Sequence, residues 1–123
     1  MEPIEVTAGM ALVGAMAGAG WPAARAEVVA FWRHVRPGEA DDVAADLTEV
    51  RAEVLAARQA GDPALERALA GTWQRRLRTL VQGDAALAAG LRNLVDQHLV
   101  PALPADERAG ITSRLPDGDS GPG

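Results

Sequence analysis

Apolar residues recur at spacings of three and four over most of the chain, the period of an amphipathic α-helix. No segment of useful length shows the apolar–polar alternation of Val, Ile and Thr that is typical of a β-strand. The clearest helical run has apolar positions spaced alternately three and four apart, as in a coiled-coil seam: Ala40, Val43, Leu47, Val50, Val54 and Ala57. The pattern predicts an all-α fold, a small bundle of four to five helices.

Glycine and proline divide this pattern into segments. Proline suits the first turn of a helix and interrupts a helix elsewhere, while glycine commonly follows the last turn. Asp62 and Asp84 each precede an apolar-periodic segment and are predicted to cap it. The predicted helices cover about residues 5–20, 22–35, 40–60, 63–82 and 85–100. We expect residues 1–100 to form one domain, and residues 101–123, rich in Pro and Gly, to form a flexible tail.

The third and fourth helices are joined only by Gly61 and Asp62, so they should fold back as an antiparallel hairpin. With the turn at this point, two residues that face each other across the hairpin have residue numbers that add to about 123. Basic residues of the fourth helix then lie across from acidic residues of the third: Arg75, Arg76 and Arg78 opposite Asp42, Asp46 and Glu49. Exposed pairs of this kind contribute only about 0–1 kcal/mol each. We therefore expect Arg76→Ala to change little, whereas Leu47→Asp or Val50→Asp should unfold or dissociate the protein.

Residues 6–24 carry no charge, which approaches the roughly 20 residues of a transmembrane helix. Ala and Gly dominate this stretch, so lipid burial would be only marginally favourable. Glu2 and Glu5 stand where a signal peptide has positive residues. Gly14 and Gly18, four residues apart, form a small-residue face that lets helices approach closely. We expect a buried or self-associating helix; the alternative is a small membrane-associated protein that inserts through residues 6–24.

The chain is mildly acidic, with 12 Lys+Arg against 17 Asp+Glu and a net charge of −5. An acidic balance argues against a nucleic-acid partner, because binding phosphates requires a basic surface. The absence of cysteine excludes disulfides and thiolate chemistry. The acidic group Asp41, Asp42, Asp46 and Glu49 is the one candidate site for a hard cation, but acidic residues near the start of a helix also suit its dipole without any ion. His34 and His98 have no metal-ligand partners at a suitable spacing. We therefore predict no catalytic residues, no metal site, no cofactor and no enzymatic activity.

With no enzymatic activity predicted, the remaining class of function is molecular recognition. We first expect self-association or a helical protein partner. An interaction surface would use the small-residue face of the first helix, the aromatic residues of the second and fourth, and the seam of the third. The candidate interaction residues are Gly14, Gly18, Trp21, Phe31, Trp32, Leu47, Val50, Val54 and Trp73.

Three strings, ALVGAMA at residues 11–17, VVAFWR at 28–33 and WQRRLR at 73–78, also carry a resemblance. In order and composition they resemble short alanine- and arginine-rich helical proteins of streptomycete-type actinobacteria, a mostly uncharacterised family. The resemblance covers roughly residues 4–100. It implies a small cytoplasmic helical protein, an accessory to larger multidomain systems, and it brings no active site with it.

Overall fold

The computed structural model describes residues 3–104, and within this range it contains helices and no strand. The all-α class and the small bundle are therefore confirmed. The α-helices are α1 (Ile4–Ala15), α2 (Trp21–Val35), α3 (Ala40–Ala60), α4 (Pro63–Val81) and α5 (Ala85–Leu94). Three short elements complete the path: the 3₁₀ turns η1 (Pro37–Glu39) and η3 (Val100–Ala102), and η2 (Val95–Leu99), a turn of π-helix.

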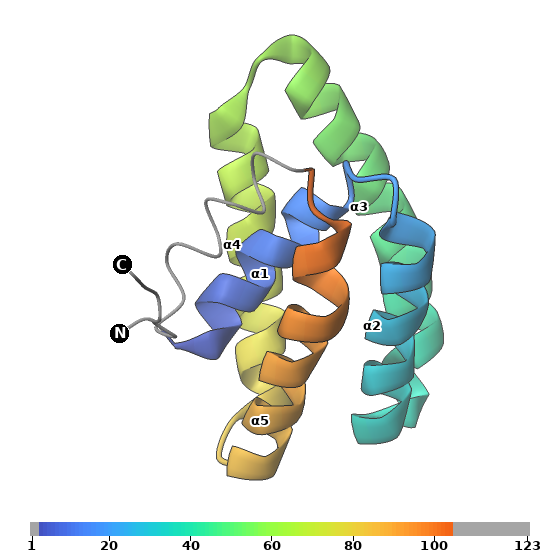
Figure 1. Ribbon diagram of the computed structural model, residues 1–123, viewed down its shortest axis with the longest axis vertical. Helices are drawn as coiled ribbons and strands as arrows, with labels where there is room; N and C mark the ends of the chain where they lie inside the picture. The colour runs from blue at the N-terminus through green and yellow to red at the C-terminus, as the bar shows by residue number, and fades with distance from the viewer. Residues whose placement is uncertain (1–2, 105–123) are drawn as a thin grey trace, which may run out of the picture.

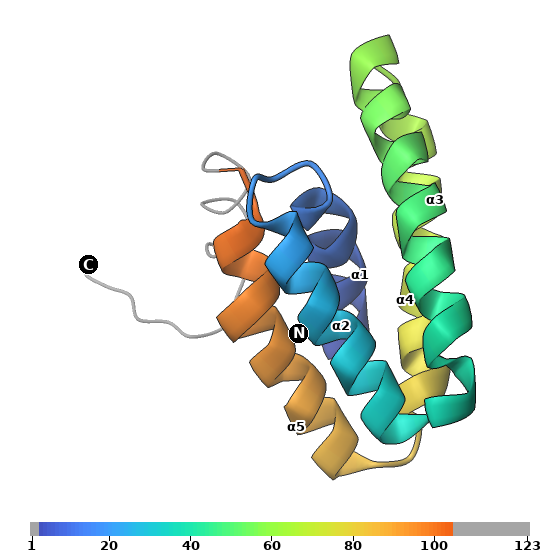
Figure 2. The same cartoon turned by 90° about the vertical axis from the view of Figure 1, so that its right-hand side faces the viewer.

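The five helices form two layers. The α3–α4 hairpin makes one layer, and α1, α2 and α5 all pack against the same side of it (Figure 1 and Figure 2). Asp62 Oδ1 accepts a hydrogen bond from the Leu65 amide at 3.1 Å and so starts α4, as its position before a proline predicted. Gly61 ends α3 in the left-handed conformation, with φ 67°.

Ion pairs fix the register of the hairpin. Arg76 Nη1 lies 3.0 Å from Asp46 Oδ2, and Arg58 Nη2 lies 2.8 Å from Glu66 Oε2. The residue numbers of these two pairs add to 122 and 124, which confirms the predicted value of about 123. Of the three arginines expected to face acidic residues, Arg76 forms such a pair; Arg75 donates instead to the Thr72 hydroxyl at 3.4 Å.

The hydrophobic core lies between the two layers. Trp32 of α2 and Trp73 of α4 meet there edge to face, with ring centroids 6.0 Å apart and ring planes at 89°. The predicted seam of α3 faces this core: Val50 is partly buried, and the remaining seam residues are fully buried. The seam is thus filled by α2 and α4 of the same chain, which are the α-helices that pack most extensively on α3.

Helix α1 ends at Ala15, five residues earlier than predicted, and the chain turns through residues 16–20. The cause is the close approach of this turn to η3. A Cβ atom on Gly18 would overlap the carbonyl oxygen of Ala102, and one on Gly20 would lie 3.3 Å from the Ala102 Cα. Arg51 Nε of α3 donates to the Met16 carbonyl at 3.1 Å and holds the turn from its other side. These glycines therefore shape a turn where the sequence predicted a continuing helix.

The packed domain also extends beyond residue 100, where the sequence placed the start of a flexible tail. Helix α5 ends at Leu94, before the predicted residue 100, and the chain continues as the π turn η2 and then as the 3₁₀ turn η3, which contains Pro101. Ala102 and Leu103 are buried against the core, because this turn lies against the α1–α2 connection. Residues 105–123, the rest of the predicted tail, lie outside the part that the structure describes.

Candidate functional site

Most of the interaction residues nominated from the sequence lie inside the fold. Gly14, Trp21, Trp32, Leu47, Val54 and Trp73 are buried, while Gly18, Phe31 and Val50 are partly buried. The expectation that the small-residue face of α1 and Trp32 form an unused apolar surface is therefore wrong. Helix α1 makes the most extensive helix–helix contact of the described chain, with α4.

The small residues of α1 serve this internal contact. At Gly9 an added Cβ would overlap the Gln74 side chain and lie 2.9 Å from the Ala70 carbonyl oxygen. Gln74 Nε2 also donates to the Val6 carbonyl oxygen at 3.2 Å, which joins the two helices by a hydrogen bond. The absence of a side chain at Gly9 lets the two backbones come this close. The face of α1 that looked available in the sequence is thus covered by α4.

The hairpin instead has a large surface that the described chain leaves uncovered. All three partner helices pack on one side of it, and its opposite side faces away from them (Figure 2). We call this surface the outer face. Its residues are exposed and mostly small or charged: Ala45, Glu49, Ala52, Glu53 and Ala56 on α3, and Ala64, Ala68, Thr72, Arg75 and Thr79 on α4.

Apart from Arg51 of α3, which is exposed and donates to the Met16 carbonyl of the α1–α2 connection, the charges of the exposed surface of the hairpin are divided between its two helices. The exposed acidic residues lie on α3 (Asp41, Asp42, Glu49 and Glu53), and the exposed arginines of α4 are Arg67, Arg75 and Arg78. Asp41 pairs with Arg33 of α2 at 3.5 Å, a contact between two exposed side chains. Among residues 3–104, no ion pair engages Glu49, Glu53 or Arg78. The outer face is therefore an acidic strip beside a basic strip.

The free end of the hairpin extends beyond the other helices (Figure 1 and Figure 2). Helix α3 has 21 residues and α1 has 12, which at about 1.5 Å per residue gives lengths of about 32 and 18 Å. Two parallel bonds between Arg58 and Glu66, at 3.0 and 2.8 Å, brace this end. Leu65 lies there and, at 41% exposed, is the most exposed large apolar side chain of residues 3–104.

Trp73 and the arginines that follow it are residue types that could also stack on and bind single-stranded nucleic acid, the class of partner that the acidic composition argues against. In the structure the guanidinium carbon of Arg76 lies 4.4 Å from the centroid of the Trp73 ring and 5.7 Å from that of Trp32. The same guanidinium pairs with Asp46, and the Trp32 indole donates to Glu39 Oε1 at 3.2 Å. The arginine that would hold a phosphate is thus committed to this chain's own rings and carboxylate.

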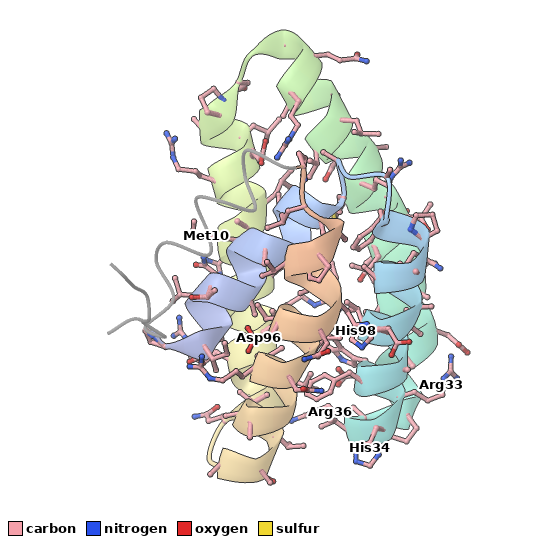
Figure 3. The ribbon with its side chains drawn as sticks, in the orientation of Figure 1. Met10, Arg33, His34, Arg36, Asp96 and His98 are labelled. Atoms are coloured by element: carbon pink, nitrogen blue, oxygen red, sulfur yellow. The ribbon has the colours of Figure 1, made fainter. Side chains whose placement is uncertain are left out.

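The two histidines lie apart and assemble no site. His98 Nε2 lies 3.8 Å from Glu27 Oε1, on the side of η2 that faces α2, whereas His34 points outward near the end of α2 (Figure 3). Within residues 3–104, no three His, Asp or Glu side chains come close enough together to hold a metal ion. None of the helices in that range combines the length and the apolar character that a membrane span requires.

Comparisons with protein-family models, curated proteins and solved structures find no match for this chain. The resemblance to actinobacterial helical proteins therefore stays an expectation.

Proposed function

We propose that this protein is a non-enzymatic, helical protein–protein interaction module whose docking surface is the outer face of the α3–α4 hairpin. The observation that carries the proposal is the uncovered two-helix surface, which continues past the three helices that cover its inner side. Small residues alternate with charges along it, for example Ala52 and Ala68 beside Glu49 and Arg75. Small side chains let a partner helix approach closely, and the charges orient it.

The projecting end of the hairpin supports the proposal on energetic grounds. Ordering the backbone costs about 1–2 kcal/mol per residue, and buried apolar surface normally offsets that cost. Between residues 58 and 68, no apolar side chain is buried or packs against the core. The bidentate Arg58–Glu66 pair and the Asp62 cap keep this end helical. A segment ordered without contributing to the core fits a surface that gains its burial from a partner.

The alternative of a membrane-inserting first helix receives no support from α1. Its 12 residues fall short of the roughly 20 needed, and Ala8, Leu12 and Val13 are fully buried in the fold. A cytoplasmic location is part of the proposal, and fractionation of source cells with an antibody to the protein tests it. Recovery in the washed membrane fraction would contradict it.

Site-specific cross-linking tests the docking surface. A photoreactive amino acid placed at Ala52 or Ala68, both exposed on the outer face, should yield a covalent adduct with a protein that mass spectrometry identifies. The same group at Ala89, exposed on α5, is the matched control and should yield none. Equal adducts at all three positions, or none at any of them, would overturn the proposal.

A further inference from the structure

We infer that the partner of the outer face is a second copy of this chain, bound by a two-fold axis that runs parallel to the hairpin. The inference rests on the proposed docking surface and specifies what occupies it. The observation behind it is the division of charge: the exposed side of α3 is acidic at Glu49 and Glu53, and that of α4 is basic at Arg75 and Arg78. A surface with both signs side by side can complement itself.

Two hairpins can meet face to face with two-fold symmetry in two ways. An axis across the hairpin places α3 on the partner's α3, so that acidic strip meets acidic strip. An axis along the hairpin places α3 on the partner's α4, so that each acidic strip meets a basic strip. Like charges in an interface are unfavourable, and opposite charges guide association and fix register. The charge division therefore selects the second arrangement, in which contacting helices are antiparallel.

The levels of the charges along the hairpin agree with this arrangement. A two-fold axis along the hairpin leaves the position along the hairpin unchanged. A residue of one chain therefore meets those residues of the partner that lie at the same level along the hairpin. Glu49 and Arg75 have numbers adding to 124, the value of the Arg58–Glu66 pair, so Glu49 lies level with the partner's Arg75. Asp42 and Arg78 are offset by about three residues, or about 5 Å of helix rise, which an arginine side chain can span. By symmetry each pair occurs twice.

The size of the face fits a modest dimer. Helices of 21 and 19 residues are about 30 Å long, and two adjacent helices are about 20 Å wide, giving about 600 Å² per copy. The total, about 1,200 Å², lies at the lower edge of specific interfaces. Exposed ion pairs are screened by salt, so the dimer should weaken as ionic strength rises.

Charge reversal on the full chain tests the inference, with sedimentation equilibrium as the measurement. We expect the unmodified chain to dimerise at micromolar concentrations. Glu49→Arg/Glu53→Arg and Arg75→Glu/Arg78→Glu should each raise the dimer Kd at least about tenfold, because each brings like charges together. An equimolar mixture of the two should regain the dimer as a mixed species. The control Arg92→Glu, exposed on α5, should leave the Kd unchanged.

Circular dichroism shows whether each variant remains helical. If a reversal variant unfolds, the neutral pair Glu49→Gln and Arg75→Gln replaces it and should raise the Kd several-fold. A chain that stays monomeric up to millimolar concentration, or reversal variants that dimerise like the unmodified chain, would overturn the inference. If the chain is monomeric and Ala52 and Ala68 cross-link to a different protein, the inference that the partner is a second copy is overturned, while the proposed docking surface stands. The absence of any cross-link would overturn both the docking surface and the second copy as its partner.

Discussion

Arg76→Ala should destabilise the protein more than the sequence led us to expect. The sequence offered only an exposed ion pair, whereas the structure adds stacking of the guanidinium 4.4 Å from the Trp73 ring centroid. The Arg76 and Asp46 side chains are 32% and 44% exposed, so solvent keeps the ion pair at about 0.2–1 kcal/mol. The stacking adds about 0.5–1 kcal/mol. The expected loss is about 1–2 kcal/mol, or a fall in Tm of about 4–16 °C for a domain of this size.

Urea unfolding followed by far-ultraviolet circular dichroism measures these differences. Asp46→Ala should cost less than Arg76→Ala, because it removes the ion pair and leaves the stacking. The double variant should match Arg76→Ala alone, since Asp46 acts here through Arg76. Arg76→Lys keeps the charge but loses the planar group that stacks, so its stability should fall between those of the unmodified protein and Arg76→Ala. An Arg76→Ala variant within about 0.5 kcal/mol of the unmodified protein, or no more destabilised than Asp46→Ala, would refute the reasoning.

Three further predictions concern the core and the helix ends, each read from the urea midpoint. Leu47→Asp places a charge where no solvent reaches and should abolish cooperative unfolding, while Val50→Asp, at a partly buried position, should leave a weakened but folded chain; equal effects would contradict the burial pattern. Gly9→Val should destabilise by about 1–3 kcal/mol because its side chain meets the α4 backbone, and an unchanged midpoint would contradict the close crossing of α1 and α4. Asp84→Ala should lose about 0.5–2 kcal/mol with the Leu87 amide cap, and no loss would show that this cap contributes nothing.

The local signals in the sequence predicted the helices well because each rests on chemistry within a few residues. Asp62 and Asp84 cap α4 and α5 as predicted, since a carboxylate before a helix satisfies amides in its first turn. The hairpin register followed from the length of one turn. The end of α1 did not follow, because Gly18 looks like a helix position until Ala102, far along the chain, is known to lie against it.

Long-range packing also decided which candidate residues were available. A small-residue face on α1 has the same pattern whether α4, a lipid or a second copy covers it, and only the fold assigns it to α4. Trp73 was likewise compatible with core packing or with base stacking, until Arg76 and Trp32 were found against its ring. Periodicity identifies which face is apolar, and it carries no information on the identity of the covering group.

The outer face is the opposite case, in which the structure leaves uncovered residues that the sequence did not nominate for interaction. From the sequence, Glu49 and Arg75 were expected to belong to the acidic and basic groups that face each other across the hairpin. The structure places Arg76, one residue further along α4, over the tryptophans and against Asp46, which is the pairing that the hairpin makes internally. Arg75 points outward as a result, because adjacent helix positions differ by about 100°. Among residues 3–104 no ion pair engages Arg75 or Glu49, and the neighbour that we infer to match both strips at the same level is an antiparallel α3–α4 pair of the same sequence.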